Sequence, residues 1–165
     1  MLSEYVVAID PGTTESGVCI VRTSDYKPID FVKIENENVG AWVFERIQNP
    51  YRLVIEMVAS YGMPVGREVF ETCVWIGRFI EQLNCPGIGY EFVYRQDEKL
   101  TLCHSVKAND ATIRQALADR FAYGQPNLGK GTKKDKGFFY GFSKDIWAAF
   151  SVAVTAIDRS KESEK

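Results

Sequence analysis

The sequence predicts an α/β domain in which a mixed five-stranded sheet is flanked by helices, and two observations favour this fold class. Three apolar segments rich in Val and Ile follow one another closely at residues 4–10, 16–23 and 29–35, as the strands of an antiparallel meander do. Further along the chain, apolar strands alternate with segments of helical periodicity. Together these patterns indicate a mixed sheet covered by helices.

The later elements follow from their local patterns. Strands are predicted at residues 51–57 and 89–94, and helices at residues 39–48, 67–83, 110–121 and 143–158. Asn109 and Ser143 are the expected N-caps of the last two helices. The helix at 67–83 carries the clearest apolar stripe, formed by Val69, Cys73, Ile76, Ile80 and Leu83. Residues 122–141 are polar and contain five glycines and four lysines, so a mobile loop is expected there.

The length of 165 residues suits one domain, which we place at residues 1–160, followed by a solvated tail at 161–165. The formal charge of −2 excludes a wholly basic nucleic-acid binder, but it does not exclude a basic face. The four cysteines form no C-x-x-C pair, which favours free thiols in a reducing compartment and argues against a structural zinc site. Without a long apolar run or a signal peptide, the chain is expected in the cytoplasm, away from membranes.

Three carboxylates lie where strands end or a helix begins. Asp10 ends the first strand, Glu56 interrupts the fourth strand one residue before its end, and Asp145 lies in the first turn of the last helix. A buried carboxylate is costly unless it is paired or binds a metal, and Mg²⁺ prefers oxygen ligands. Taken singly, each acid has a structural explanation: Asp10 as a turn residue, Glu56 as an edge-strand surface residue, and Asp145 as a helix-start acid. The three together favour a Mg²⁺ site.

The segments "AIDPGTTESG", "LVIEMV" and "KDIWAAFSVAV" follow one another along the chain. In this order they resemble the RuvC-type Holliday-junction resolvases of the ribonuclease H-like superfamily, particularly the phage-encoded ones. The resemblance covers most of the chain and implies a ribonuclease H-like sheet. It also implies that Asp10, Glu56 and Asp145 are the catalytic residues and bind two Mg²⁺ ions, for which Mn²⁺ can substitute.

The implied activity is two-metal phosphodiester hydrolysis of four-way junctions, and of forks and other branched DNA. Asp10 would bridge both ions, one of which activates a water while the other stabilises the leaving 3′-oxygen. Because a junction has two strands to cut symmetrically, the resemblance also implies a homodimer. The helix at residues 67–83 is the candidate interface, although its apolar stripe also suits a core.

Two positions depart from the family pattern. An acid or a histidine is usual three residues before the helix aspartate, and this chain has Phe142 there. The fourth ligand is therefore missing, displaced or replaced by water. An aromatic wedge is usual three residues after the strand-four glutamate, where this chain has Ala59. Either Tyr61 or Met63 substitutes for that wedge, or the selectivity for junctions is relaxed.

Basic residues in the second half of the chain are the expected DNA contacts. Lys107 precedes the helix at 110–121, which presents Arg114, and the resemblance places this lysine near the scissile backbone. The segment "GKGTKKDKG" suits a loop that follows a phosphate backbone and becomes ordered on contact, although its composition is also typical of a solvated loop. Its basic residues are Lys130, Lys133, Lys134 and Lys136.

Two other functions remain open from the sequence. "DPGTTESG" also resembles the phosphate loop of sugar kinases and actin-like ATPases, whose fold doubles this unit and needs a second domain that 165 residues do not provide. An inactive DNA-binding scaffold would have a damaged acid trio, whereas only the fourth position departs here. Other ribonuclease H-like nucleases, including RNase H itself, fit the acid spacing less well.

Overall fold

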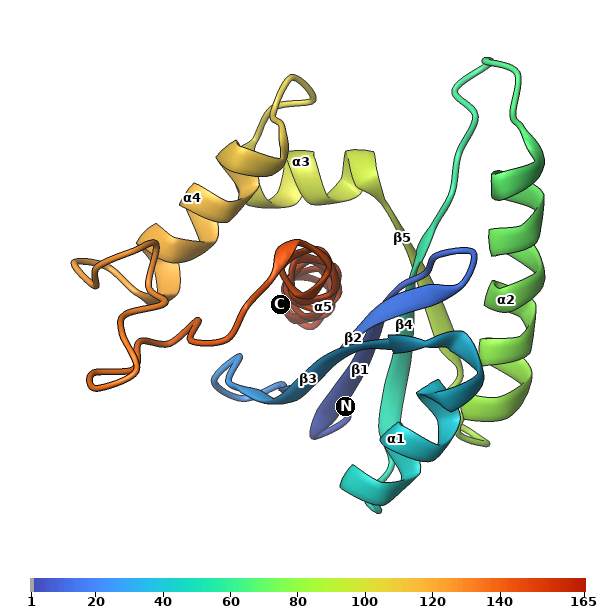
Figure 1. The fold of residues 1–165 in the computed structure, drawn as a ribbon, viewed down its shortest axis with the longest axis horizontal. Helices are drawn as coiled ribbons and strands as arrows, with labels where there is room; N and C mark the ends of the chain where they lie inside the picture. Colours follow the sequence, from blue (N-terminus) through green and yellow to red (C-terminus); the bar gives the residue numbers. More distant parts are fainter. Residues whose placement is uncertain (1) are drawn as a thin grey trace.

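A five-stranded sheet forms the centre of the protein, with the strand order β3-β2-β1-β4-β5 (Figure 1). The computed structural model describes residues 2–165. The first three strands pair antiparallel, while β4 pairs parallel with β1 and β5 pairs parallel with β4. The predicted mixed sheet and its antiparallel meander are therefore confirmed. The strands are β1 (Tyr5–Asp10), β2 (Glu15–Arg22), β3 (Pro28–Glu35), β4 (Tyr51–Met57) and β5 (Tyr90–Tyr94).

Helices cover both faces of this sheet. They are the 3-10 helix η1 (Asn36–Asn38) and the α-helices α1 (Val39–Arg46), α2 (Arg67–Leu83), α3 (Arg95–Cys103), α4 (Asp110–Phe121) and α5 (Lys144–Ser163). The hydrophobic pattern does not reveal α3, because that segment is mostly polar. It also ends the last helix too early, since α5 continues beyond residue 158 into the segment expected to be a solvated tail.

The two predicted N-caps behave differently. The Asn109 side chain accepts a hydrogen bond from the Thr112 amide at 2.9 Å, so it caps α4 as predicted. Ser143 occupies the N-cap position of α5, but its side chain makes no capping bond. The predicted N-cap position of Ser143 is therefore confirmed, and it is the Ser143 carbonyl that accepts the first helical bond, from the Trp147 amide at 2.9 Å.

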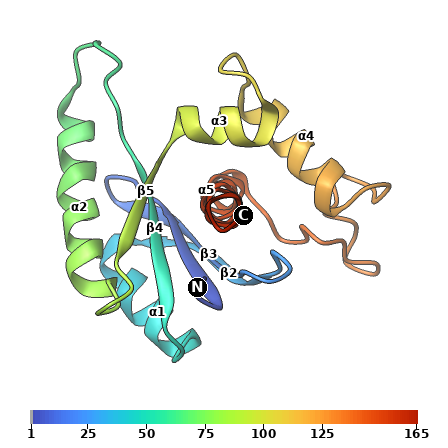
Figure 2. The same cartoon turned by 180° about the vertical axis from the view of Figure 1, so that it is seen from behind.

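Side chains alternate along the strands and build a separate core on each face of the sheet. Val6 and Ala8 of β1 pack with α5, whereas Val7 and Ile9 pack with α1 and α2. Figure 1 shows α5 on one side of the sheet and α2 on the other, and Figure 2 shows from behind that α3 and α4 lie beyond α5. Enclosed in this way, α5 is apolar and buried on nearly all sides, as expected for a central helix.

The inward face of α2 differs slightly from its predicted stripe. Its buried residues are Thr72, Ile76, Phe79 and Leu83. The other predicted stripe members are only half-buried. The opposite face leaves Phe70 and Val74 exposed. Ile76, Ile80 and Leu83 of the predicted stripe thus serve the core, and the exposed apolar surface of α2 is formed by other residues.

The glycine-rich segment between α4 and α5 packs more closely than its composition predicts. Phe139 and Phe142 are fully buried against Trp147 and Phe150 of α5. Gly124, Gly129, Gly131 and Gly141 have positive φ angles, so they serve turns. A bridge between Gly131 and Lys136 closes the tip. The aromatic side chains therefore anchor a segment that its glycines and lysines predicted to be mobile.

All four cysteines are free, as predicted. No helix within residues 2–165 is long and apolar enough to cross a membrane. The reducing, cytoplasmic location stays a prediction.

Candidate active site

Asp10 and Glu56 lie together because their strands are neighbours. The parallel register of β1 and β4 pairs Ile9 with Ile55, so the next residue of each strand leaves the sheet at the same edge. The alternation of side chains turns both carboxylates to the face that α5 covers. The convergence expected from the two strand ends is therefore present in the structure.

Gly17 of β2 allows Asp145 to join this pair. In the antiparallel register Gly17 lies directly opposite Asp10. A Cβ atom at residue 17 would lie 2.4 Å from the carbonyl oxygen of Asp145, a distance that real Cβ atoms do not show. The absence of a side chain at Gly17 therefore lets the first turn of α5 approach the end of β1.

The turn between β1 and β2 is closed by its own hydrogen bonds. The Gly12 amide donates to the Ser16 hydroxyl at 3.2 Å, and that hydroxyl donates to Asn36 Oδ1 at 2.6 Å. The Asn36 side-chain amide in turn donates to the Gly12 carbonyl at 2.9 Å. Asn36 is buried, so the turn is held from beneath by the segment that follows β3. Its Gly12 amide is engaged within the protein and is not free to cradle a phosphate.

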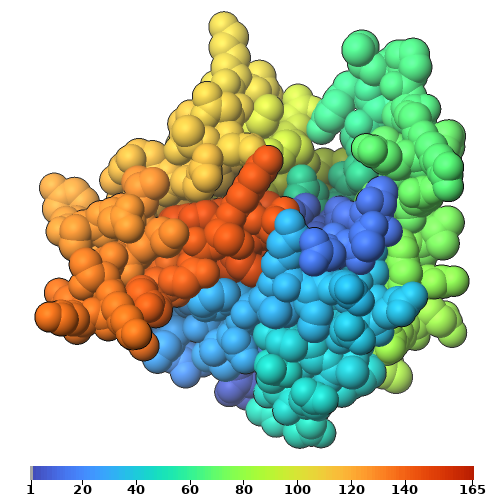
Figure 3. Space-filling model, in the orientation of Figure 1, coloured from blue at the N-terminus to red at the C-terminus, as the bar shows by residue number. Residues whose placement is uncertain are grey.

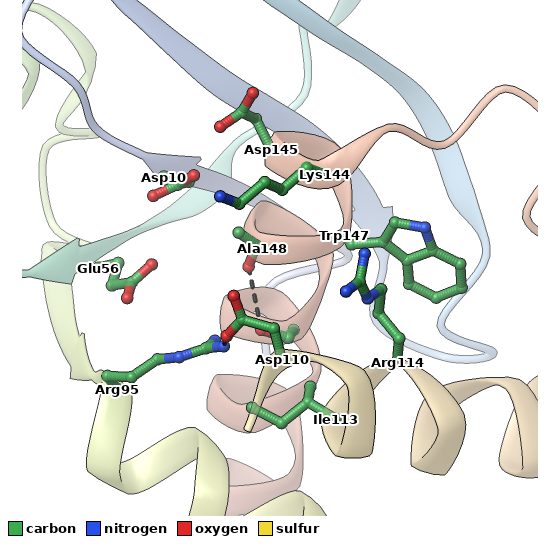
Figure 4. A pocket seen from close by; sticks show the side chains of 11 residues that line it. Asp10, Glu56, Arg95, Asp110, Ile113, Arg114, Lys144, Asp145, Trp147 and Ala148 are labelled. Atoms are coloured by element: carbon green, nitrogen blue, oxygen red, sulfur yellow. Dashed lines mark hydrogen bonds and ion pairs between the residues drawn. The ribbon is translucent and has the colours of Figure 1, made fainter. Parts of the chain in front are cut away.

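The three acids open into a pocket of about 180 Å³, several times the ~30 Å³ share of one water molecule. Figure 4 shows them with basic side chains around them, and the amino end of Lys144 points toward Asp10. Arg114 also lines the pocket, as do Trp147 and Ser151 of α5. An acidic centre with a basic surround suits a phosphodiester held near bound cations. The basic residues that line the pocket are Arg95, Arg114 and Lys144.

Helix α3 adds two charged residues that the sequence analysis does not identify. Glu98 is fully buried; Arg95 donates to its Oε1 atom at 3.2 Å, and the Ser151 hydroxyl donates to the same atom. Arg95 also forms an ion pair with Asp110, at the start of α4. The sequence feature that could have predicted α3 is the pair of acids Asp97 and Glu98, because acids are favoured in the first turn of a helix. Nothing in the local pattern indicated that Glu98 is buried.

The carboxylates in and behind the pocket raise one another's pKa values in spite of the basic side chains beside them. Burial, together with the negative charges of Glu56 and Asp145, raises the pKa of Asp10 to about 8, although Arg95 opposes this shift. Burial and the mutual repulsion of Glu56 and Glu98 raise the pKa of Glu56, and burial raises that of Glu98. Such a group attracts cations and is a candidate functional site.

The donor atoms fit a hard divalent cation, but the acids are not yet gathered around one point. Carboxylate oxygens are the ligands that Mg²⁺ and Mn²⁺ prefer. Within residues 2–165, however, no three Asp, Glu, His or Cys side chains are close enough to hold an ion. One reason is that Asp145 forms an ion pair with Lys33 at 2.8 Å, and Lys33 also lies 3.8 Å from Glu15. A bound cation would replace the Lys33 ammonium as the partner of Asp145.

The family pattern has a fourth metal ligand at the position of Phe142, but here this side chain lies among aromatic rings. Its ring centroid lies 4.8 Å from that of Phe31 and 5.1 Å from those of Phe139 and Trp147. The side chain is 1% exposed. This position therefore belongs to the aromatic core that anchors the start of α5, and it contributes no ligand.

The other predicted DNA-binding residues lie outside the pocket. Lys107 is exposed in the connection between α3 and α4, and Tyr61 is 63% exposed in the connection between β4 and α2. Figure 3 shows these connections as two protrusions, yellow and green, with a hollow between them. The lysine-rich segment, orange in Figure 1, lies on the other side of α5 from α2. Its exposed residues are Lys133, Lys134 and Lys136, while Lys130 is half-buried.

No protein-family model matches this sequence, and no curated protein matches it. Solved structures do match. A structure of Thermus thermophilus RuvC superposes with a TM-score of 0.64 and 15% identity, covering 96% of each chain. T. thermophilus RuvC in complex with a Holliday junction substrate superposes with a TM-score of 0.65 and 14% identity, covering 95% of each chain. The protein therefore has the fold of RuvC, and the predicted ribonuclease H-like class is confirmed.

Proposed function

We propose that this protein is a divalent-metal-dependent endonuclease that cleaves four-way DNA junctions and other branched DNA. One observation carries the proposal: three half-buried carboxylates, Asp10, Glu56 and Asp145, meet in one pocket with basic side chains in its walls, at one edge of a RuvC-like sheet. The structural match in complex with a Holliday junction substrate supports the choice of branched DNA.

Asp10, Glu56 and Asp145 would hold Mg²⁺ or Mn²⁺ ions. When bound, such ions supply a nucleophilic water and stabilise the leaving 3′-oxygen of a phosphodiester. The protein itself contributes position and charge. Lys144 and Arg114 line the pocket and can contact the phosphates that flank the scissile bond. No covalent intermediate is needed, so no nucleophilic Ser or Cys is assigned.

Tyr61 is the proposed stacking residue, in place of the wedge that Ala59 does not provide. It has a φ of 48°, which is unusual for a bulky residue, and it stands beside Gly62 in a tight turn at the tip of its connection. Strained, exposed residues of this kind cluster at functional sites. An exposed aromatic ring can stack on any base for ~1–3 kcal/mol.

A homodimer fits the two symmetric cuts that resolve a four-way junction. The outer face of α2 supports this proposal, because Phe70 and Val74 are 63% and 59% exposed there. These two residues are one turn apart on the helix, so they form a continuous apolar strip.

Two observations weigh against the kinase-like alternative. The Gly12 amide of the candidate phosphate loop is already bonded to Ser16. The described chain forms one five-stranded sheet rather than the two units that such a fold requires. The inactive scaffold is less favoured because all three acids face one pocket.

The deciding experiment measures binding and cleavage on a four-way junction, a fork and a linear duplex, first in EDTA and then with Mg²⁺ or Mn²⁺. We expect branched DNA to bind without metal and to be cut with it, in paired cuts on opposed strands of the junction. Asp10→Asn should bind the junction and leave it uncut. Cleavage that persists in this variant, or hydrolysis of ATP without DNA cleavage, would overturn the proposal. Binding without cleavage in either metal would favour the scaffold.

The lysine-rich segment is tested separately through salt dependence. Each phosphate contact that is lost lowers the slope of log K against log salt by about one unit. Replacing its four lysines with alanine should therefore weaken junction binding most at low salt. An unchanged slope would remove Lys130, Lys133, Lys134 and Lys136 from the DNA contacts.

A further inference from the structure

Glu98 is a buried carboxylate that is only partly satisfied by the fold. It is 0% exposed and lies behind the pocket wall. Both of its hydrogen-bond donors, Ser151 and Arg95, serve the Oε1 atom. The Oε2 atom is buried and has no hydrogen-bond donor among residues 2–165. Because an unsatisfied buried charge is costly, a fully buried glutamate at this position calls for a compensating role.

The neighbours of Glu98 are the acids of the candidate site. Both donors to Glu98, Arg95 and Ser151, line the pocket together with Asp10 and Glu56, and the charge of Glu98 raises the pKa of Glu56. Arg95 binds Glu98 and shares its guanidinium with Asp110, and Lys144 points toward Asp10 (Figure 4), so two cations face four acids. The group thus carries more negative than positive charge, and a bound divalent cation would restore the balance.

The chain path explains how Glu98 reaches this place. Glu56 pairs with Val93 in the parallel register of β4 and β5. Helix α3 begins directly after β5 ends at Tyr94, so its first turn stands at the same sheet edge as Glu56. Ser151 of α5 then holds Glu98 from the other side. Strand β5, α3 and α5 together fix this carboxylate behind Glu56.

We propose that Glu98 is a positioning residue of the cation site, which holds Arg95 and Ser151 in the pocket wall and supplies, behind Glu56, the negative charge that the position of Phe142 lacks. This inference rests on the proposed function of the site. Glu98 does not line the pocket, so it acts through its neighbours rather than as a direct ligand. Carboxylates that orient metal ligands in this way affect metal affinity although they do not touch the ion.

Glu98→Gln tests this role, because glutamine keeps the shape and removes the charge. We expect the affinity for Mn²⁺, measured by calorimetry as the binding that Asp10→Asn abolishes, to fall about 10–100-fold. The unfolding free energy in EDTA should stay the same or rise, since a like charge is removed from a buried acidic group. A purely structural role predicts the reverse: a less stable metal-free protein with unchanged Mn²⁺ affinity.

Glu91→Gln is the matched control. Glu91 lies on the neighbouring strand β5, where it pairs with Arg52 at 3.4 Å, away from the pocket. This variant should bind Mn²⁺ like the wild type. Ser151→Ala provides a second test that keeps the charge of Glu98 and removes its hydroxyl donor. It should weaken Mn²⁺ binding less than Glu98→Gln does. If Glu98→Gln does not fold, weaker Mn²⁺ binding by Ser151→Ala than by the wild type supports the role of Glu98, and equal binding removes it.

The outcomes separate this inference from the function on which it rests. If the wild type binds no divalent cation that depends on Asp10, the proposed function itself fails. If the wild type binds Mn²⁺ and both Glu98→Gln and Ser151→Ala bind it equally well, only the role of Glu98 fails. Loss of affinity in Glu98→Gln with retained metal-free stability supports the inference.

Discussion

The two ends of β4 face the same helix but carry charge in opposite ways. Arg52 and Glu56 lie on one face of the strand, toward α5. At the first end Arg52 pairs with Glu91 at 3.4 Å and donates to the Ala156 carbonyl at 3.2 Å. At the other end Glu56 meets Asp10 and Glu98, which are both acids. At the first end the cation is thus paired with an acid, whereas at the other end several acids lie together and share Arg95.

This difference separates a structural use of buried charge from a functional one. A buried charge that is paired and hydrogen-bonded holds elements together, and breaking the pair destabilises the fold. A group of like charges destabilises the fold, so its presence needs another explanation, such as the binding of a counter-ion. Mutations at the two ends should therefore affect stability and activity in opposite ways.

The largest expected effect is at the acidic end. Glu56→Gln removes one charge of the site and should lower metal-dependent cleavage of a four-way junction by ~10²–10³-fold or more. The same change should leave the metal-free protein equally or more stable in urea, because it relieves repulsion with Asp10 and Glu98. Single-turnover cleavage and urea unfolding in EDTA measure the two effects. A variant that cuts at the wild-type rate would end the assignment of Glu56.

The next effect concerns how closely α5 approaches the acidic end. In Gly17→Ala the new methyl group would meet the Asp145 carbonyl, so the first turn of α5 must move. We expect a loss of about 1–3 kcal/mol in stability and a fall of up to ~10²-fold in cleavage, because small misplacements are costly in active sites. Gly77→Ala is the control. Gly77 is exposed on α2 with open space around it, so alanine should raise stability by ~0.5–1 kcal/mol without changing cleavage.

The end of β4 at Arg52 should show the opposite pattern. Arg52→Leu leaves Glu91 without its partner and removes hydrogen bonds to Ala156 and Ser160. Glu91 is 27% exposed, so we expect a loss of about 2–3 kcal/mol, below the 3–5 kcal/mol typical of a fully buried pair. The cleavage rate of the folded variant should stay unchanged. If Arg52→Leu lost as much cleavage activity as Glu56→Gln, the two ends of β4 would be coupled.

A further expected effect is a dependence of metal-free stability on pH. Burial and neighbouring acids raise the pKa of Asp10 to about 8, so the folded protein holds a proton that the unfolded chain, with a pKa near 3.9, has released. Stability should therefore decrease as the pH rises from about 4 to about 8. Asp25, whose pKa is lowered to about 2 by a hydrogen bond from Arg22, acts in the opposite sense but only at lower pH.

Urea unfolding in EDTA across this pH range measures the decrease, and Asp10→Asn should reduce it. Saturating Mn²⁺ should reverse the trend, because the cation binds the deprotonated carboxylates. A wild-type profile that is flat in EDTA would show that the acids are not buried in the way the structure places them.

The hydrophobic pattern of the sequence was sufficient to predict which face of the sheet Asp10 and Glu56 occupy. The alternation of apolar residues in β1 and β4 defines which face each side chain meets, and the strand order of the fold class makes the two strands neighbours. Periodicity therefore predicts the face of the sheet that Asp10 and Glu56 occupy, and the fold class predicts that they lie side by side. The same holds for the sheet and for most helices, whose hydrophobic patterns are strong.

The positions of the residues that surround this pair, Glu98, Phe142 and Gly17, were determined only by tertiary packing. Helix α3 is mostly polar, so its pattern shows neither that it forms nor that Glu98 points inward. The sequence shows that Phe142 stands where the family pattern has an acid. It does not show that this ring packs on Phe31 of the distant strand β3 as well as on its neighbours Phe139 and Trp147. Gly17 looks like an ordinary turn glycine until α5 is seen against it. Periodicity is a local property that reports which face is buried, whereas the partner on that face depends on elements far apart in sequence.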